Sequence, residues 1–480
     1  MLGGETIAGL EVTGITCDSR KVLPGSVFAA LPGSEVDGSR FIAEAVNNGA
    51  IAVIAERSPS DLSIPVIADP NPRRLYAELA ARFYGKQPAT IAAITGTNGK
   101  TSVAVFTSQL WALLGHKSAN LGTLGVDLLG WTDETQPKIP QIPPLTTPDP
   151  TDLHKCLADL EQAGVSHLAL EASSHGLDQF RLEGIHFTRA AYTNLSRDHL
   201  DYHGDLQSYL DAKSRLFLEV LDQDGVAVIN ADDPYADQIS SICHARGVRV
   251  ISCGVRGTDI KIVEVQAHAS GLILSLEVMG KSYEIETALV GSFQVSNMVL
   301  ALGLVIEDGI DVERVVPLLS KLQGARGRVE LVASHPNGAA VYVDFAHTPD
   351  ALETVLKALR PHARGKLRVV FGCGGDRDAG KRPEMGKAVC ENADDVIVTD
   401  DNPRSEDPAL IRQQAQVGCP GASNIGGRSA AIAEAIGRLE ADDILVVAGK
   451  GHEIGQKIGN IVHPFNDADE ILKIIKGLKA

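Results

Sequence analysis

The segment Ile94-Thr95-Gly96-Thr97-Asn98-Gly99-Lys100-Thr101-Ser102 decides the fold around it and predicts a site for a nucleoside triphosphate. An apolar, β-branched run at 90–94 precedes it, as in a buried strand, and residues 102–111 after it have helical spacing. The two glycines therefore lie in a strand-to-helix turn, where backbone N–H groups converge on anionic oxygens. The lysine adds a cation for the β- and γ-phosphates, and the hydroxyl of the next threonine can coordinate Mg²⁺. We therefore predict that ATP and Mg²⁺ bind at this loop.

The loop departs from the general P-loop pattern at one position, because the first glycine of that pattern would fall at Ile94. A glycine turn that merely precedes a lysine and a threonine is the alternative interpretation. The apolar run before the loop, the helical run after it and the Gly-Lys-Thr sequence together favour the nucleotide site.

Length and composition are typical of a globular protein of about three domains. The chain has 480 residues, of which 44% are hydrophobic and 22% charged, and its net charge of −17 disfavours nonspecific nucleic-acid binding. It has no apolar run long enough to span a membrane, and its first residues do not resemble a signal peptide. Seven cysteines without a C-x-x-C pair argue against a disulfide framework or a structural zinc site. We therefore expect a cytoplasmic protein. We also expect a monomer that acts on small molecules.

Turn-rich junctions near 84–88 and 323–328 divide the sequence into three predicted α/β domains, at 1–87, 88–325 and 326–480. The first contains short apolar strands and one helix. In the other two, strands alternate with helices, which predicts mostly parallel sheets covered on both faces. The predicted strands are 27–31, 51–55, 90–94, 167–171, 190–193, 226–230, 340–344, 367–371, 395–399 and 443–448, and the predicted helix of the first domain is 42–46.

Acidic and histidine residues follow two predicted strands of the central domain. Glu171 ends the strand at 167–171, where a carboxylate suits a Mg²⁺ ligand, although an exposed loop acid is the alternative. The run 194–203 places two acids and two histidines within six positions, which suits metal or phosphate chemistry, whereas any one of these histidines alone is more often structural. Lys213 reads as an ordinary lysine on a helix surface. Cys373, in a glycine loop without a base motif, reads as a small buried residue and not as a nucleophile.

Taken together, nine motifs in order along nearly the whole chain resemble the Mur ligase family, the ATP-dependent amino-acid-adding enzymes of bacterial peptidoglycan synthesis. The motifs are Asp18-Ser19-Arg20, Gly-Thr-Asn-Gly-Lys-Thr at 96–101, Thr146-Thr147-Pro148, Glu-Ala-Ser-Ser-His-Gly at 171–176, the run 194–203, Asp-Phe-Ala-His-Thr-Pro-Asp at 344–350, Gly-Cys-Gly-Gly-Asp-Arg-Asp at 372–378, Asp401-Asn402-Pro403-Arg404 and Gly-Lys-Gly-His-Glu at 449–453. The resemblance implies a UDP-binding first domain, a P-loop ATPase domain and a Rossmann-like third domain.

The resemblance also implies roles for individual residues. Its substrates would be ATP, with Mg²⁺, and a UDP-N-acetylmuramoyl-L-alanyl-D-glutamate to which meso-2,6-diaminopimelate is added. ATP would be bound by Gly96, Thr97, Asn98, Gly99, Lys100, Thr101, Ser102, Asn297, Arg328, Asp344 and His347. The UDP-muramoyl dipeptide would be bound by Ser19, Ser34, Glu35, Val36, Thr146, Thr147, Ser173, Gln179, Arg181 and Lys213. Diaminopimelate would be bound by Arg377, Asp401, Asn402, Pro403, Arg404, Gly449 and Glu453.

The catalytic set implied by the resemblance is Lys100, Glu171, His199 and Lys213, with Thr101, Glu171, His199 and a carbamylated Lys213 around the metal ions. Two positions depart from the family pattern, since Gln294 replaces a common asparagine and Phe345 a common tyrosine. The implied reaction activates the D-glutamate carboxylate as an acyl phosphate, which the incoming amine then attacks.

Selection of the amine depends on Arg404 in this interpretation, because a guanidinium can hold the distal carboxylate of diaminopimelate and repels the distal ammonium of lysine. Two other classes remain open. A folylpolyglutamate synthase shares the P-loop domain but gives no reason for the first domain or for Asp401-Asn402-Pro403-Arg404. A non-catalytic regulator that binds a muramoyl nucleotide has no need for the intact set Lys100, Glu171, His199 and Lys213.

Overall fold

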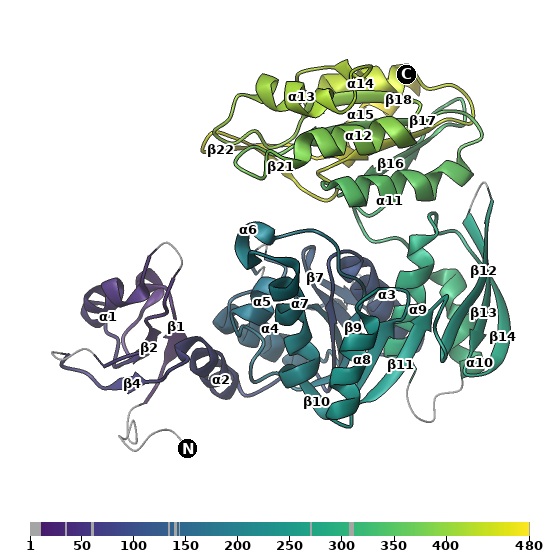
Figure 1. Ribbon diagram of the computed structural model, residues 1–480. Helices are drawn as coiled ribbons and strands as arrows, with labels where there is room; N and C mark the ends of the chain where they lie inside the picture. Colours follow the sequence, from purple (N-terminus) through teal and green to yellow (C-terminus); the bar gives the residue numbers. More distant parts are fainter. Residues whose placement is uncertain are drawn as a thin grey trace.

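The chain folds around three separate main sheets in a computed structural model that describes residues 11–33, 36–58, 62–132, 135–138, 142–143, 145–268, 271–306 and 312–479. Figure 1 shows the N-terminal unit (purple) beside the central unit (blue to teal), with the C-terminal unit (green to yellow) above the central one. The predicted limits after residues 87 and 325 fall between the last element of one unit and the first of the next. We keep the division into 1–87, 88–325 and 326–480 as a proposal.

The N-terminal unit is a four-stranded parallel sheet, in the order β1-β2-β3-β4, with apolar clusters on both faces. Its longest helix begins where the Asn71 side chain accepts a hydrogen bond from the Arg74 backbone N–H, and it ends before Gly85, whose φ of 67° suits a glycine. The strands are β1 Gly14–Thr16, β2 Ser26–Ala29, β3 Ala52–Ala55 and β4 Val66–Ala68; the helices are α1 Ile42–Asn47 and α2 Pro72–Tyr84, with 3-10 turns η1 Ser19–Lys21 and η2 Gly38–Phe41.

The central unit is a ten-stranded sheet in the order β14-β13-β12-β11-β10-β9-β5-β8-β6-β7, with parallel pairing from β6 to β12 through the middle. Its strands are β5 Thr90–Thr95, β6 Ser118–Gly122, β7 Gly125–Leu129, β8 His167–Glu171, β9 Phe187–Tyr192, β10 Leu221–Asn230, β11 Arg249–Gly254, β12 Ile260–His268, β13 Gly271–Val278 and β14 Lys281–Thr287. Its helices are α3 Lys100–Leu113, α4 Pro150–Gln162, α5 Ser174–Asp178, α6 Leu200–His203, α7 Leu206–Arg215, α8 Ala236–Ala245, α9 Phe293–Val305 and α10 Val312–Val315, with the shorter turns η3 Leu216–Val220 and η4 Val316–Lys321.

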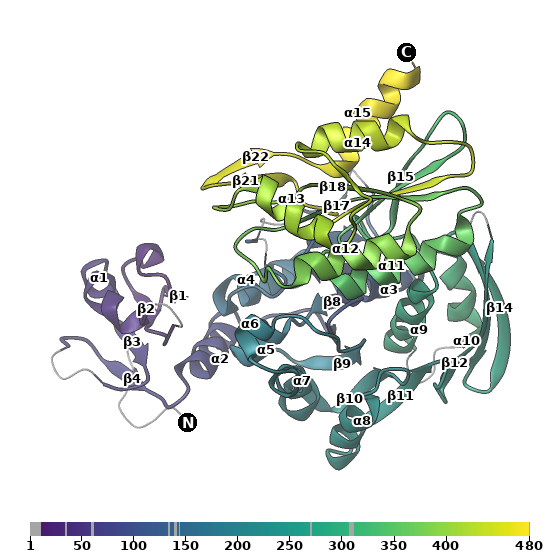
Figure 2. The same cartoon turned by 45° about the horizontal axis from the view of Figure 1, so that its top comes forward.

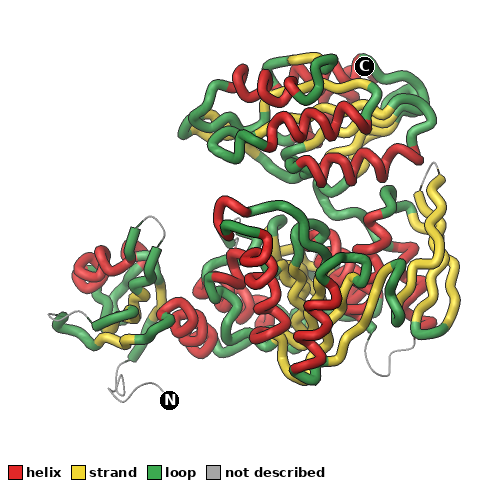
Figure 3. The backbone as a smooth tube through the Cα atoms, in the orientation of Figure 1, coloured by secondary structure: helices red, strands yellow, loops and turns green. Residues whose placement is uncertain are grey.

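Helices cover both faces of the central sheet, as predicted. Alternate residues of β5 point to opposite sides, so that Ile94 packs in the cluster of α3 and α9 and Ala93 in the cluster of α4, α7 and α8. The predicted strands at 90–94, 167–171, 190–193 and 226–230 are confirmed. The antiparallel extension β12–β14 was not predicted, and Figure 3 shows it at the far edge of the sheet, away from the N-terminal unit.

The C-terminal unit is a six-stranded sheet in the order β15-β16-β20-β17-β18-β19, parallel except for β15. A separate antiparallel hairpin, β21–β22, projects from one side of it (Figure 2). The strands are β15 Glu330–Ser334, β16 Ala340–Asp344, β17 Leu367–Cys373, β18 Asp395–Asp400, β19 Ser423–Asn424, β20 Ile444–Ala448, β21 Gly455–Ile458 and β22 Ile461–Pro464. The helices are α11 Pro349–Leu359, α12 Lys381–Asn392, α13 Pro408–Val417, α14 Arg428–Gly437 and α15 Asp467–Lys479, with the 3-10 turn η5 Arg360–His362.

The remaining sequence expectations about the fold agree with the structure. The predicted strands of the first and third domains and the helix at 42–46 are all present. Cys373 is buried beside the Met385 sulfur, and burial raises the pKa of its thiol to about 12, so it is not poised as a nucleophile. No helix in the described ranges has the length and apolar character that crossing a membrane requires.

Candidate active site

The loop between β5 and α3 has the predicted strand-to-helix geometry. Gly96 and Gly99 have φ of 145° and 87°, and a Cβ at these positions would lie 1.8 Å from the Thr193 hydroxyl and 2.5 Å from the Asn297 amide oxygen. Only glycine fits such positions. The Lys100 ammonium donates to the Gly96 and Thr97 carbonyls at 2.9 and 2.8 Å, so it lies back across the loop whose N–H groups would face phosphate. Desolvation lowers the pKa of Lys100, while the negative charge of Glu171 opposes the shift.

Glu171 lies at the carboxyl end of β8, directly beside β5, and its side chain is buried. One carboxylate oxygen accepts from the Thr101 hydroxyl at 3.0 Å and from the Thr123 backbone N–H at 2.9 Å. A Cβ on Gly122 would lie 2.2 Å from this oxygen, so the glycine makes room for the carboxylate. Glu171 is therefore not an exposed loop acid.

The oxygens of Thr101 and Glu171 fit a Mg²⁺ ion. No group of three or more His, Cys, Asp and Glu side chains able to hold a metal exists among the described residues. The protein therefore offers a few hard oxygen ligands and not a closed cage. Mg²⁺ usually binds in this way in phosphate-transferring enzymes, with one or two protein ligands, substrate phosphates and water.

Lys213 is not the surface lysine that its sequence suggested. Its side chain is 1% exposed, and its ammonium donates to the Gly96 carbonyl at 2.8 Å, the same oxygen that Lys100 contacts. Burial lowers the pKa of Lys213 well below its usual value, and the positive charge of Lys100 lowers it further. Two ammonium groups that share one carbonyl repel each other, which favours a neutral or anionic form of Lys213.

His199 lies at the start of α6 with φ of 53° and with its imidazole 3.6 Å from the Asp198 carboxylate. The imidazole of His175 lies against it, with ring centroids 4.9 Å apart. Burial lowers the pKa of His199, and Asp198 opposes this shift. His199 therefore presents a largely neutral ring toward the nucleotide loop.

A cavity of about 450 Å³ lies at the loop between β5 and α3, and it is lined by residues of both the central and the C-terminal unit. Its predicted lining residues include 97–102, Thr146, Glu171, His199, Asn297, Arg328, Asp344 and His347. The Arg328 guanidinium donates to the Thr101 hydroxyl at 3.3 Å and stacks over the Phe345 ring at 4.5 Å. Asp344 accepts from the backbone N–H groups of Val329 and Ala346, and burial raises its pKa. Gly96 and Lys213 do not line this cavity, and the Lys213 ammonium contacts the loop through the Gly96 carbonyl.

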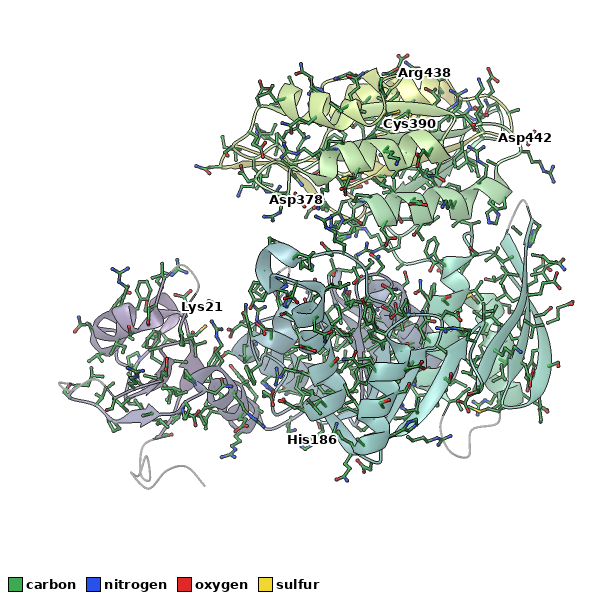
Figure 4. All side chains as sticks on the ribbon, in the orientation of Figure 1. Lys21, His186, Asp378, Cys390, Arg438 and Asp442 are labelled. Atoms are coloured by element: carbon green, nitrogen blue, oxygen red, sulfur yellow. The ribbon has the colours of Figure 1, made fainter. Side chains whose placement is uncertain are left out.

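The two departures from the family pattern have local explanations. Gln294 accepts a hydrogen bond from the Asn297 amide at 3.0 Å and therefore orients it. Phe345 supplies the ring on which Arg328 stacks, which needs no hydroxyl. A polar contact also joins the two units outside the cavity: Asp378, labelled on the lower side of the C-terminal unit in Figure 4, lies 4.0 Å from Arg197.

A second cavity, of about 300 Å³, lies between the N-terminal and central units and includes Val36, Gln179 and Arg181. Arg181 donates to the carbonyl of Thr147 and to the side chain of Gln179, and the Thr147 hydroxyl donates to the Glu171 carbonyl. Ser173 belongs to the same chain of hydrogen bonds, because its backbone N–H donates to the Thr147 hydroxyl at 2.9 Å. Ser19 is held by Glu44 outside this cavity, and Ser34 and Glu35 lie outside the described residues.

Sequence reasoning missed three side chains of the second cavity, those of Tyr76, Cys17 and Asp149. The Tyr76 hydroxyl donates to the Asp149 carboxylate at 2.7 Å, and the Cys17 thiol donates to the other oxygen of Asp149 at 3.3 Å. Asp149 also caps α4 by accepting from the Thr151 backbone N–H. The Asp-Pro pair directly after Thr147 and Pro148 could have signalled the cap, but nothing local links it to Tyr76.

The predicted diaminopimelate residues form a third cluster at the carboxyl ends of β18 and β20. Asn402 donates to the Glu453 carboxylate at 2.9 Å, and a Cβ on Gly449 would lie 3.0 Å from Asp401. Arg404 has φ of 52°, and its guanidinium donates to the Gly375 carbonyl at 2.7 Å. Pro403 is buried, and the exposed Arg377 lies near Gly374, where an added Cβ would be 3.8 Å from the Arg377 side chain and 3.0 Å from the Arg404 guanidinium.

Arg404 has no carboxylate partner in the described part of the chain, since none of the ion pairs there includes it. Its half-buried guanidinium is near enough to Asp376 to help lower the pKa of that carboxyl group, but the two side chains form no ion pair. A loop that offers a free guanidinium and a carboxylate suits a zwitterionic ligand.

Three family profiles match successive parts of the chain. Residues 11–84 match the profile described as Mur ligase family, catalytic domain, residues 94–305 match the Mur ligase middle domain, and residues 327–451 match the Mur ligase, glutamate ligase domain. The UDP-N-acetylmuramoyl-L-alanyl-D-glutamate–2,6-diaminopimelate ligase of Bradyrhizobium diazoefficiens is 50% identical, over 97% of this chain and 95% of its own. The ligase of the same name from Caulobacter vibrioides is 48% identical, over 98% and 96%.

Solved structures of similar fold are also ligases with Mur names or functions. A structure of a UDP-N-acetylmuramoyl-L-alanyl-D-glutamate–2,6-diaminopimelate ligase has a TM-score of 0.70 at 36% identity and covers 98% of this chain and 96% of its own. The MurF ligase of Thermotoga maritima in complex with ADP has a TM-score of 0.62 at 18% identity, covering 96% and 97%, and so shows a shared fold. Three profiles that together match most of the chain, and relatives near 50% identity over almost its full length, leave one assignment. The chain belongs to the Mur ligase family.

Proposed function

We propose that the protein is a cytoplasmic, monomeric ligase of peptidoglycan precursor synthesis that adds meso-2,6-diaminopimelate to UDP-N-acetylmuramoyl-L-alanyl-D-glutamate with ATP. The cavity that joins Lys100 and Glu171 of the central unit to Arg328 of the C-terminal unit carries this proposal. It places cations and an acid around the glycine loop, as phosphoryl transfer requires. The names of the relatives near 50% identity support the choice of substrates.

Activation of the carboxylate comes first in the proposed mechanism. A carboxylate does not react with an amine at neutral pH, because oxide is a poor leaving group. Lys100 of the central unit and Arg328 of the C-terminal unit both line the cavity, and they would neutralise charge on the phosphates while the γ-phosphoryl group moves to the D-glutamate carboxylate. The amine then attacks the acyl phosphate, and orthophosphate leaves. Residues from both units enclose the cavity and limit hydrolysis of this intermediate.

Mg²⁺ would be held by the Thr101 hydroxyl and the Glu171 carboxylate, which lie 3.0 Å apart. We propose His199 and a carbamylated Lys213 as further groups of this region. The ion would neutralise the phosphate oxygens as charge shifts to the leaving group. The other predicted nucleotide residues, Asn297, Asp344 and His347, line the same cavity.

The muramoyl substrate would extend between the two cavities. The path runs from Gln179 and Arg181, in the cavity beside the N-terminal unit, through Thr147 to Thr146 in the nucleotide cavity. In this proposal the uridine end would lie toward Val36 and Ser19 and the D-glutamate end toward Lys100. Ser34 and Glu35, which we keep in the proposal, fall outside the described residues.

The amino-acid substrate would bind at Asp401, Asn402, Arg404, Gly449 and Glu453, with Arg377 beside them. Arg404 suits the distal carboxylate of diaminopimelate, and Glu453 suits its distal ammonium. L-Lysine has no distal carboxylate to pair with the guanidinium. The site should therefore reject it.

ATP turnover with the dipeptide nucleotide is the direct test of this function. We expect ADP and phosphate to form with meso-diaminopimelate, and at a much lower rate with L-lysine, because lysine leaves Arg404 unpaired. Assays that give each amine at low concentration compare kcat/KM directly. Equal rates with the two amines would contradict the assigned specificity. Turnover with a folate and L-glutamate instead would establish the folylpolyglutamate alternative.

A further inference from the structure

Lys450 lies between Gly449 and Glu453, and its side chain is fully buried at 0% exposed. Its ammonium donates to the Glu453 carboxylate at 2.6 Å, to the Gly455 carbonyl at 2.7 Å and to the Asn402 amide oxygen at 3.3 Å. A buried ammonium is costly unless it is paired and hydrogen-bonded. All three of its contacts are with the loop and hairpin that form the amino-acid cluster.

These contacts close a triangle of three side chains. Asn402 accepts from Lys450 and from the backbone N–H of Lys457 at 2.8 Å, and it donates to the same Glu453 oxygen that Lys450 contacts, at 2.9 Å. The amide of Asn402 therefore has both its oxygen and its nitrogen fixed. In the described part of the chain, the second carboxylate oxygen of Glu453 accepts no hydrogen bond. The Glu453 side chain as a whole is 34% exposed.

The β21–β22 hairpin holds the same loop from its backbone side. Gln456 donates to the Asp401 carbonyl at 2.6 Å, the Arg404 backbone N–H donates to the Lys457 carbonyl at 3.1 Å, and the Gly459 N–H donates to the Arg404 carbonyl at 2.7 Å. Lys450 binds the start of this hairpin through the Gly455 carbonyl. One buried ammonium thus ties the hairpin, Asn402 and Glu453 together.

We propose that Lys450 is a positioning residue for the amino-acid substrate, a role that rests on the proposed function of this cluster. It holds one oxygen of Glu453 so that the other faces the substrate ammonium. It also keeps Asn402 and, through the hairpin, Arg404 at fixed positions. Lys450 itself is buried and does not contact the substrate. Pre-organised groups of this kind lower the cost of ordering on binding.

The test is Lys450→Met, which keeps the length of the side chain and removes the charge and the donors. We expect KM for diaminopimelate to rise about 10- to 100-fold, as for lost hydrogen bonds to charged groups, and KM for ATP to stay within about threefold. Lys457→Met is the matched control, because Lys457 contributes only backbone groups to the loop and its side chain is exposed. Lys450→Gln retains a donor and serves if the methionine variant does not fold.

A double variant, Lys450→Met with Glu453→Gln, separates positioning from a general structural role. If Lys450 acts through Glu453, the two effects are less than additive. Unchanged KM for diaminopimelate in a folded Lys450→Met or Lys450→Gln protein overturns the inference and leaves the proposed function intact. Equal rises in KM for diaminopimelate, ATP and the dipeptide nucleotide also overturn it. A wild-type protein that does not use diaminopimelate at all contradicts the proposed function instead.

Discussion

Arg404→Ala is expected to lower kcat/KM for meso-diaminopimelate by about 30-fold to several thousand-fold, since loss of one partner of a desolvated charge pair costs about 2–5 kcal/mol. The guanidinium has no carboxylate partner in the described protein, so its removal frees no buried acid. Its hydrogen bonds go to two neutral acceptors, the carbonyls of Gly375 at 2.7 Å and Asn402 at 3.5 Å. The variant should therefore lose kcat/KM for the amino acid, while its KM for ATP stays nearly unchanged. Steady-state kinetics with each substrate varied in turn measures both.

The same variant should discriminate less between diaminopimelate and L-lysine, because the charge that repels the distal ammonium is gone. Arg404→Lys should recover only part of the activity, since an ammonium lacks the two parallel donors of a guanidinium. Arg360→Ala is a matched control: its exposed guanidinium pairs with Asp394 just before β18, at the opposite end of the strand from Arg404. If diaminopimelate kinetics are the same in Arg404→Ala and wild type, Arg404 does not hold the substrate.

Most strands of the parallel sheets were predictable because their signals are local. Each is a short apolar run bounded by glycine or acidic residues, and the glycines of the P-loop can be read directly as positions that exclude a side chain. Glu171 could also be placed, because a polar residue at the end of a buried strand has to lie at the carboxyl edge of the sheet. The family resemblance then predicted that residues of the third domain contact the nucleotide, and Arg328 does line the nucleotide cavity.

Features that depend on distant contacts were not predictable from the residues alone. Lys213 has an ordinary helical context, and it is buried only because α7 packs under the loop after β5, 117 residues earlier. The same holds for Tyr76 and Asp149, which meet across 73 residues. The β21–β22 hairpin and the triangle around Lys450 form because β18 and β20, which lie on either side of β17, end at the same edge of the third sheet, an order that no local pattern encodes.

Lys213→Ala is expected to lower kcat by about 100- to 1,000-fold, the range seen when one group that stabilises transition-state charge is removed. An ammonium at this position would add positive charge beside Lys100 and the metal, whereas a carbamate would supply an anion. Burial makes the modification chemically reasonable, because a lowered pKa of Lys213 increases the share of neutral amine, which can attack CO₂ and release one proton. Lys155→Ala, which removes an exposed lysine of α4, should retain full activity.

Rescue distinguishes a carbamate from a packing role for Lys213. Deletion of the side chain leaves a space behind the glycine loop, where a small carboxylate such as acetate can supply the missing anion. We expect acetate or formate to restore part of the activity of Lys213→Ala and to leave wild type unaffected, while chloride at equal ionic strength does nothing. In wild type, removal of CO₂ should lower activity and bicarbonate should restore it. Full activity in Lys213→Ala would exclude the role. An inactive variant that no carboxylate rescues, together with wild-type activity insensitive to CO₂, would show that Lys213 acts as an unmodified buried amine at the Gly96 carbonyl.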